Sequence, residues 1–514
     1  MTEKIADVHP TPKTLKIVER AREHGNRTAI VDGDHAHDYA ELLQRSEAVA
    51  SALLQGRPDL AETRVAFLAP AGFEYFSMQW GIWRAGGIAV PLSVAATHPE
   101  LDHVLRDSEA EIVIVMRAFA ASVPPLQENV RLLYWEDLDP QATGALPEIQ
   151  ESRRAMILYT SGTTSRPKGV VSTHASLRAQ IETLVAAWHW SADDRIPLFL
   201  PLHHIHGIVN IACCALWSGA CIETFPKFIE PKILSRVAAG AYTVFMAVPT
   251  IYVKLIDSLR PGNLPDEKRA RILQGFSRMR LMVSGSSALP ASVHHEWREL
   301  TGQVLLERYG MTETGMILSN PYHGERRPGT VGHPLPSVEV RLRTENGEPV
   351  QPGEPGEVQV RGPMVFREYW QQPEATRESF TDGWFRTGDM ALLEDGYYRI
   401  LGRLATDIIK SGGYKISALE IEAAVMEHPA IRECAVVGIA DQKWGEVIAL
   451  AAALEEGQKD LSLHQLNEWS RTRLSPYKLP RKLLVLDRLP RNGMGKVQKK
   501  AITSLLMQKP TSGS

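Results

Sequence analysis

The stretch that decides the fold reads Ile-Leu-Tyr-Thr-Ser-Gly-Thr-Thr-Ser-Arg-Pro-Lys-Gly-Val and spans residues 157–170. It begins with three apolar residues typical of a strand, and a second apolar run starts at Val170. Between them lies a loop of small and hydroxyl residues with two cations, Arg166 and Lys168. Hydroxyls and free backbone N–H groups can donate to phosphate oxygens, and a lysine adds a point charge. The stretch therefore predicts a strand that opens into an anion-binding loop.

This loop is not the P-loop of nucleotide hydrolases. In that motif the lysine directly follows the second glycine, whereas here Lys168 precedes Gly169. A Ser/Thr-rich composition alone would fit a solvated loop. Fourteen residues in this order make that interpretation the weaker one.

Length and composition limit the number of domains and the class of protein. The 514 residues exceed what one hydrophobic core usually organises, so two or three domains are expected. Apolar residues make up 44% and charged residues 23%, which is typical of a globular protein. A formal net charge of −3 gives no basic excess for nucleic acid, and no stretch is apolar enough to span a bilayer.

The N-terminus and the cysteines suggest a compartment. Residues 1–25 mix acids with bases and lack an apolar segment, so we expect neither a signal peptide nor a transit peptide. The four cysteines form no Cys-x-x-Cys pair and fit a reducing environment. Together these features predict a cytoplasmic location.

Strands and helices alternate along the first half of the chain, which predicts a parallel sheet with helices on its faces. Strands are expected at 28–31, 65–68, 89–92 and 111–116, and helices at 39–54 and 74–85. After residue 330 the composition becomes β-rich and indicates a small antiparallel barrel. Its strands are expected at 338–342, 357–360 and 397–400.

Several further motifs follow the loop in a fixed order. They are Ser284-Gly285, the run Arg308-Tyr309-Gly310-Met311-Thr312-Glu313, the run Trp384 to Asp389, Gly402-Arg403, and the run Arg491 to Lys496. Together they resemble the motifs of the adenylate-forming superfamily of acyl-CoA synthetases, adenylation domains and luciferases. The resemblance covers residues 25 to 506, and it is nearest to malonyl-CoA synthetases. Ser165 stands where the family usually has glycine.

The resemblance implies an α/β fold with two main domains. A large N-terminal domain, residues 1–402, would consist of two helix-covered sheets plus a small β-barrel and would hold the ATP and acyl pockets. A small, mobile α+β C-terminal domain, residues 403–506, would carry the catalytic lysine and dock CoA, and residues 507–514 would form a tail. The family usually has two residues between Gly-Arg and an aspartate. Here three residues precede Asp407, so the position of the hinge stays open.

The resemblance also implies a site for MgATP. Lys168 would hold the β- and γ-phosphates together with the loop residues Thr160, Ser161, Gly162, Thr163 and Thr164. Tyr309 would stack on the adenine, framed by Ser284 and Gly285. Asp389 would hold both ribose hydroxyls, with help from Arg403.

Three residues would act on the reacting phosphate. Thr312 would contact the α-phosphate, and Glu313 would bind Mg²⁺, a role that suits a hard carboxylate oxygen. Lys496 would be the adenylation lysine. The plain alternative is that Lys496 is one more cation in a basic tail.

The acyl pocket is expected at a histidine-rich motif. His203, His204 and His206 lie close together, which raises the question of a metal, but their frame is apolar and no acid is near. A buried, hydrogen-bonded histidine is the ordinary interpretation. By resemblance, His204, Ile205, His206 and Met311 line the pocket for the acyl group.

Lys254 is the predicted selector of a second carboxylate. It lies one turn into a helix that Pro249 opens, where a lysine is usually a snorkelling surface residue. Malonyl-CoA synthetases tend to carry Arg or Lys here, so we expect Lys254 to pair with the distal carboxylate of malonate. Ser286 and His294 are the next candidates for that carboxylate.

By resemblance, Gly412, Gly413, Trp444 and Tyr477 form the docking surface for CoA. The predicted function is an acid–thiol ligase that converts malonate, ATP and CoA into malonyl-CoA, AMP and pyrophosphate. The alternatives are methylmalonate or another short- or medium-chain acid, and a carrier protein as the acceptor of the acyl group. A non-catalytic acyl-nucleotide binder is disfavoured, because the key residues of the family are present.

Overall fold

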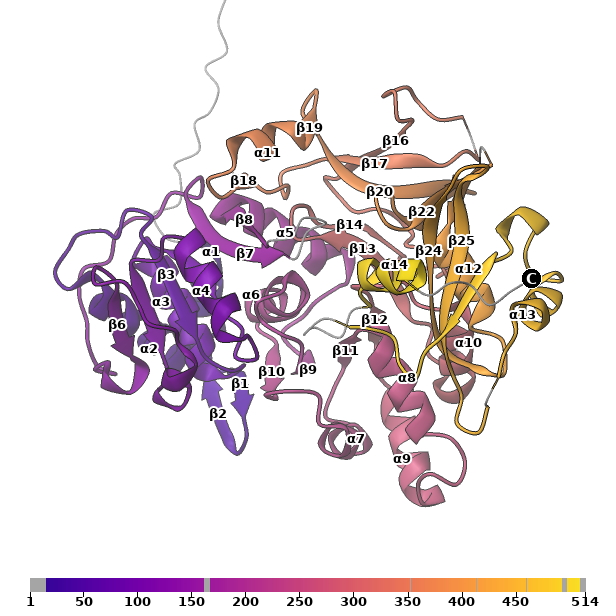
Figure 1. Ribbon diagram of the computed structural model, residues 1–514. Helices are drawn as coiled ribbons and strands as arrows, with labels where there is room; N and C mark the ends of the chain where they lie inside the picture. Colours follow the sequence, from indigo (N-terminus) through magenta and orange to yellow (C-terminus); the bar gives the residue numbers. More distant parts are fainter. Residues whose placement is uncertain are drawn as a thin grey trace, which may run out of the picture.

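The computed structural model describes residues 15–160, 167–351, 353–412, 414–458, 460–491 and 497–508. Its first sheet contains the deciding stretch and has the strand order β18-β8-β7-β4-β3-β5-β6 (Figure 1). The strands from β7 to β6 run parallel, while β8 and β18 are antiparallel to their neighbours. The bounds are β3 Arg64–Leu68, β4 Ile88–Pro91, β5 Ile112–Val115, β6 Arg131–Tyr134, β7 Arg154–Thr160, β8 Lys168–Thr173 and β18 Glu368–Tyr369.

Helices cover both faces of this sheet, because its central strands are apolar throughout. In β3, Val65 and Phe67 face the core that contains residues of α2 (Tyr39–Leu54) and α3 (Phe73–Arg84). Ala66 and Leu68 face the opposite core, to which α4 (His98–Asp107) contributes. Side chains of a strand alternate between faces, so one apolar run supplies two cores.

Two further sheets lie next to each other. One has the order β2-β1-β10-β9 and the other β11-β12-β13-β14-β15. They are linked where the Thr243 N–H donates to the Arg195 carbonyl, at 3.0 Å. The bounds are β1 Thr28–Asp32, β2 His35–Asp38, β9 Arg195–Leu198, β10 Cys221–Thr224, β11 Val244–Ala247, β12 Leu281–Ser284, β13 Leu306–Met311, β14 Gly315–Ser319 and β15 His333–Pro334.

Helices of the first 301 residues complete these layers. Buried residues of most of them join the same core as the strands. The bounds are α1 Lys16–His24, α5 His174–Ala187, α6 Cys214–Ser218, α7 Glu230–Ala238, α8 Pro249–Ser258, α9 Asp266–Ser277 and α10 Ala291–Thr301, with 3₁₀ turns η1 Arg117–Ser122 and η2 Trp135–Asp137. A π-helical segment, η3 His206–Cys213, precedes α6.

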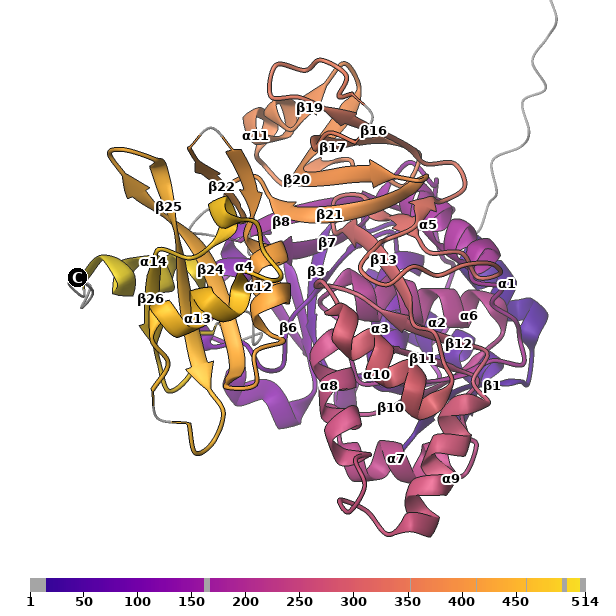
Figure 2. The same ribbon diagram turned by 90° about the vertical axis from the view of Figure 1, so that its right-hand side faces the viewer.

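The β-rich region forms a five-stranded antiparallel sheet above the others (Figures 1 and 2). Its order is β16-β17-β20-β19, with β21 paired to β20. The same residues were expected to form a small barrel; they form this sheet. The bounds are β16 Glu339–Arg343, β17 Gly356–Arg361, β19 Phe380–Thr381, β20 Trp384–Glu394 and β21 Tyr397–Arg403, and α11 is Pro373–Glu378.

The C-terminal part is an α+β unit with cores of its own. Its sheet has the order β23-β22-β25-β24, with β26 parallel to β25 (Figure 2). The bounds are β22 Ile408–Ser411, β23 Tyr414–Ser417, α12 Ala418–Val425, β24 Ile431–Asp441, β25 Gly445–Leu454, α13 Leu463–Ser470, η4 Pro476–Lys478, β26 Lys482–Val485 and α14 Lys499–Gln508.

The predicted fold class is confirmed: an α/β body with helix-covered sheets and a β-rich sheet, followed by a small α+β unit. The helix predicted at 39–54 has the observed bounds of α2, and a capping box of Asp38 and Glu41 stabilises its start. The tail was expected from 507, but α14 continues to Gln508. No described helix is long and apolar enough to cross a bilayer.

A buried ion pair ties two sheets together. Asp194, which is 2% exposed, accepts from Arg280 at 2.7 and 2.5 Å and from the Thr243 hydroxyl at 2.7 Å. Burial acts to raise the pKa of Asp194, but the hydrogen bonds from Arg280 and Thr243 outweigh it and lower this pKa. The pair therefore contributes stability at neutral pH, and the contribution is lost as pH falls through the lowered pKa.

We expect Arg280→Met to destabilise the protein by about 3–5 kcal/mol, because it leaves a buried carboxylate unpaired. The matched control is Arg271→Met, which removes an exposed pair with Glu267 on α9. The measurement is the urea midpoint of each variant at pH 7 and pH 4. Equal midpoints for the two variants at pH 7 would contradict the role given to Asp194.

Candidate active site

A pocket of about 470 Å³ opens beside the deciding stretch. Its lining brings together five predicted site residues that are far apart in the sequence: Thr160, Lys168, Met311, Glu313 and Arg403. Thr160 ends β7 and Lys168 begins β8, and the two are direct partners in the antiparallel register. Both ends of the predicted anion-binding loop are therefore fixed at the edge of this pocket.

Asp389 lies beside this pocket on β20, where its register partner is Arg403 of β21. Arg403 Nε is 3.2 Å from Asp389 Oδ1, and the Tyr309 hydroxyl donates to Oδ2 at 2.5 Å. Burial raises the pKa of Asp389, while Arg403 and Tyr309 favour its charged form. Asp389 is thus a buried carboxylate with one oxygen hydrogen-bonded to Tyr309 and the other paired with Arg403. A carboxylate can accept further hydrogen bonds at each oxygen, which the predicted ribose contact would use.

Glu313 lies in the tight turn between β13 and β14, with Thr312 half-buried beside it. Its carboxylate is buried, and Oε1 accepts from the Tyr369 hydroxyl at 3.0 Å. Burial raises the pKa of Glu313 and disfavours its carboxylate form. A cation bound at this point would act in the opposite direction and favour the carboxylate. A carboxylate oxygen on the wall of this pocket fits Mg²⁺, which Glu313 would hold.

The predicted acyl motif contains an unusual backbone. His206 begins the π-helical segment η3, and such segments are frequent at functional sites. A side chain on Gly207 would place Cβ 2.6 Å from the Pro201 carbonyl oxygen, so the turn into η3 requires glycine. The Nδ1 atom of His206 is 3.0 Å from the Ser286 hydroxyl. Burial lowers the pKa of His206 and keeps its ring neutral.

The other histidines of the motif lie nearer the surface. His203 and His204 are half-buried, with ring centroids 4.2 Å apart, and Ile205 is half-buried as well. Burial lowers the pKa of His203 to about 4. No three His, Cys, Asp or Glu side chains in the described parts of the chain are grouped as metal ligands would be.

Arg308 is the buried cation that sequence reasoning missed. It lies on β13 and is 5% exposed, and its Nε and one terminal nitrogen have no hydrogen-bond partner among the described residues. Burial lowers its pKa to about 10, so it stays charged at neutral pH, and its charge contributes to the lowered pKa of His206. A Cβ on Gly285 would lie 2.5 Å from its Cζ.

A signal for Arg308 was present in the sequence. Leu306 and Arg308 are two apart on a strand, so they point to the same face. An arginine on the buried face of a central strand needs either a partner or a ligand. Gly285 leaves room for it, which gives that glycine a second role besides framing the adenine.

Lys254 does not share this buried region. The structure places it on the exposed face of α8, beside the exposed Val253. This is the ordinary place for a long cationic side chain. Of the second candidates, Ser286 contacts His206, whereas His294 is buried with Nε2 3.1 Å from the Leu305 carbonyl oxygen. Ser284 is buried at the end of β12.

Three of the residues predicted to dock CoA, Gly412, Trp444 and Tyr477, lie on the C-terminal unit. The Gly412 N–H donates to the Trp444 carbonyl at 2.9 Å, and a Cβ on Gly412 would lie 2.9 Å from the Trp444 ring. The Arg481 guanidinium lies 4.1 Å from the centre of that ring. Tyr477 is exposed and stacks on Tyr414 with a centroid distance of 4.5 Å.

The three residues between Arg403 and Asp407, one more than the family usually has, form a hydrogen-bonded turn. Both Thr406 and Asp407 donate backbone hydrogen bonds to the Arg403 carbonyl, and Asp407 Oδ2 accepts from the Arg403 N–H at 3.0 Å. Lys499, at the start of α14, is 2.7 Å from Asp407 Oδ1 and 2.8 Å from Glu422 Oε1. This half-buried ion cluster joins the segment after Arg403 to the last helix.

Some predicted site residues lie outside the described residues. They are Ser161, Gly162, Thr163, Thr164, Gly413 and Lys496. Their roles stay predictions from the sequence. Of their described neighbours, Thr160 and Lys168 line the pocket and Gly412 contacts Trp444.

Two family models match the chain. The one described as AMP-binding enzyme matches residues 17–370, and the one described as AMP-binding enzyme C-terminal domain matches residues 420–496. The first match spans more than half of the sequence. The chain therefore belongs to the AMP-binding enzyme family.

Individual proteins are similar to this chain over most of its length. The chain is 44% identical to the mitochondrial malonate–CoA ligase ACSF3 of Xenopus laevis, over 95% of this chain and 91% of the relative. It is 40% identical to the malonate–CoA ligase of Arabidopsis thaliana, over 94% and 86%. The crystal structure of ATP-bound MatB from Rhodopseudomonas palustris superposes with a TM-score of 0.85 at 33% identity, over 96% of this chain and 99% of that one.

We expect Asp389→Asn to weaken ATP binding roughly 10–100-fold, because a hydrogen bond to a charged group contributes about 1.5–3 kcal/mol. The matched control is Glu339→Gln, an exposed carboxylate on β16 of the same sheet. Calorimetric titration of ATP into each variant is the measurement. Unchanged affinity in Asp389→Asn would remove Asp389 from the nucleotide site.

Proposed function

We propose that this enzyme is an ATP-dependent acid–thiol ligase that activates malonate as its adenylate and transfers it to CoA. The family match and the malonate–CoA ligases among the relatives support the reaction class. The observation that supports malonate as the substrate is the buried guanidinium of Arg308 near His206. We therefore assign to Arg308 the role predicted for Lys254.

The physical argument concerns unpaired charge. A cation buried without a partner is costly, and a carboxylate brought next to it relieves that cost. Malonate has one carboxylate to react and a second to pair with Arg308. A monocarboxylic acid of similar size would leave the guanidinium unpaired, so the site should reject it.

In the first half-reaction, one malonate carboxylate oxygen attacks the α-phosphorus of ATP. A new P–O bond forms as the bond to the bridging oxygen breaks, and pyrophosphate leaves. Lys168 would stabilise the β- and γ-phosphates, Thr312 the α-phosphate and Lys496 the approaching carboxylate. Positioning and charge neutralisation are the main needs of such a transfer. Mg²⁺ bound at Glu313 would offset phosphate charge.

In the second half-reaction, the CoA thiolate attacks the acyl carbon of the adenylate. A C–S bond forms, the bond to the AMP oxygen breaks, and AMP leaves. For this step we propose that a C-terminal domain, residues 403–506, rotates on an N-terminal domain, residues 1–402. The rotation would replace Lys496 with the turn that holds Gly412 and Gly413, and Trp444 and Tyr477 would dock CoA.

Two related activities are the alternatives. Methylmalonate differs by one methyl group. One solved relative, 37% identical with a TM-score of 0.68, is a malonyl-CoA ligase in a ternary product complex with methylmalonyl-CoA and AMP. A carrier protein could replace CoA as acceptor. The Arg481–Trp444 contact supports CoA, because it offers a flat cationic and aromatic surface to an adenine.

For the compartment we propose the cytoplasm, as the sequence predicts. The animal relatives are named as mitochondrial, and this is a statement about those proteins. The described cysteines are unbridged, which suits either reducing compartment. Fractionation of cells that express the tagged chain decides between the two.

We expect Arg308→Met to lower kcat/KM for malonate by at least about 30-fold, since losing one partner of a buried charge pair costs roughly 2–5 kcal/mol. Activity with butyrate should change far less. Lys254→Ala is the comparison variant and should leave kcat/KM for malonate nearly unchanged. The opposite pattern would return the role of selector to Lys254.

The reaction itself is tested by carboxylate-dependent AMP release with MgATP and CoA. Malonate, methylmalonate, succinate, acetate, butyrate and octanoate are compared side by side. We expect malonate to have the highest kcat/KM. A monocarboxylate ahead of malonate would contradict the substrate, and pyrophosphate release without a thioester would point to a carrier protein.

A further inference from the structure

Tyr369 lies between two groups that the proposed reaction uses. Its hydroxyl donates to Glu313 Oε1 at 3.0 Å. The Lys168 ammonium lies 4.9 Å from the centre of its ring. All three residues line the 470 Å³ pocket. One side chain thus contacts both the magnesium-binding carboxylate and the phosphate-binding lysine.

We propose that Tyr369 is a positioning residue, whose hydroxyl orients Glu313 for Mg²⁺ and whose ring holds Lys168 for the phosphates. The inference rests on the proposed function, which assigns those roles to Glu313 and Lys168. A hydroxyl that holds Oε1 fixes the carboxylate plane and leaves Oε2 to a cation. The ring face attracts the ammonium and limits the positions that its long side chain can adopt.

The backbone brings Tyr369 to this point from a distant part of the chain. Strand β18 pairs with β8, with Tyr369 opposite Val170. The Trp370 N–H donates to the Gly169 carbonyl at 2.8 Å. A Cβ on Gly169 would lie 2.8 Å from Ile157 and 3.2 Å from Trp370. The glycine that follows Lys168 therefore allows β18 to approach closely.

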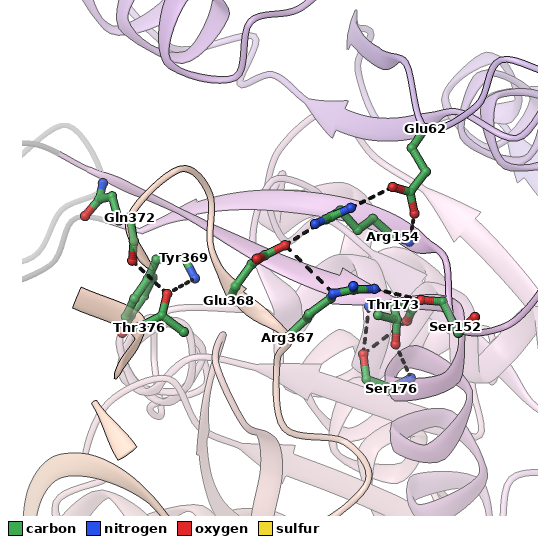
Figure 3. A network of polar contacts seen from close by, with 10 residues as sticks. All are labelled: Glu62, Ser152, Arg154, Thr173, Ser176, Arg367, Glu368, Tyr369, Gln372 and Thr376. Atoms are coloured by element: carbon green, nitrogen blue, oxygen red, sulfur yellow. Dashed lines mark hydrogen bonds and ion pairs between the residues drawn. The ribbon is translucent and has the colours of Figure 1, made fainter. Parts of the chain in front are cut away.

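Polar contacts hold β18 without using the Tyr369 side chain (Figure 3). Arg154 pairs with Glu368 and with Glu62, each at 2.7 Å. The Tyr369 N–H donates to the Thr376 hydroxyl at 3.0 Å. Because these contacts involve neighbouring side chains and the backbone, substitutions of the Tyr369 side chain should leave the strand in place.

The chemistry of the hydroxyl fits a fixed donor. A phenol is protonated at neutral pH, so the Tyr369 hydroxyl is able to donate to the Glu313 carboxylate, as it does here. The backbone of Glu313 is fixed as well, since its carbonyl accepts from the Phe366 N–H at 2.7 Å.

Two variants separate the two roles. Tyr369→Phe keeps the ring and removes the hydroxyl, so the Mg²⁺ concentration needed for half-maximal ATP binding should rise about tenfold. Tyr369→Leu also removes the ring, so ATP affinity at saturating Mg²⁺ should fall about threefold or more. The measurement is calorimetric titration of ATP at several Mg²⁺ concentrations, without any acid substrate.

A double-mutant cycle tests whether Tyr369 acts through Glu313. In a Glu313→Gln background, Tyr369→Phe should have no further effect on the Mg²⁺ requirement. The matched control is Tyr397→Phe, which removes a hydroxyl that donates to the Glu325 carbonyl at 2.9 Å, outside the pocket lining. This control should bind MgATP as the wild type does.

Three outcomes would overturn the inference. They are an unchanged Mg²⁺ requirement in Tyr369→Phe, an additive effect in the Glu313→Gln background, and equal ATP affinity of Tyr369→Leu and Tyr369→Phe at saturating Mg²⁺. Because the readout is ATP binding, a failure of malonate to react would count against the proposed function alone. The two proposals can therefore fail separately.

Discussion

The physical constraint at the centre of this enzyme is a guanidinium buried on strand β13, close enough to His206 to lower the pKa of that ring. Arg308 is 5% exposed, and two of its nitrogens are without a partner in the described structure. A buried charge persists only where something repays its desolvation. Gly285 leaves room for this guanidinium, and burial together with the Arg308 charge lowers the pKa of His206, so its ring stays neutral. A second carboxylate on the substrate would pair with this guanidinium.

Much of the architecture could be predicted from local sequence signals. The period of apolar residues gave α2 its bounds, and the stretch at 157–170 correctly marked a strand opening into a loop whose ends, Thr160 and Lys168, are paired. The order of motifs predicted which distant residues would meet at the pocket. Glu313, Lys168 and Arg403 do so.

The parts that could not be predicted depend on contacts between distant segments. Nothing local to Tyr369 shows that its two-residue strand pairs with β8, since the partners are about 200 residues apart. The exposure of Lys254 and the burial of Arg308 are set by how α8 and β13 pack. The π-helical turns of η3 depend on the close approach of Gly207 to Pro201, which a sequence pattern does not show.

The most direct test of the account is a crystal structure of this chain with a non-hydrolysable malonyl-adenylate analogue. The account predicts that the distal carboxylate lies about 2.7–3.0 Å from the guanidinium nitrogens of Arg308. In the same structure, the Tyr369 hydroxyl should still contact Glu313. A distal carboxylate in solvent, or one paired with Lys254 while Arg308 stays alone, would contradict the central claim.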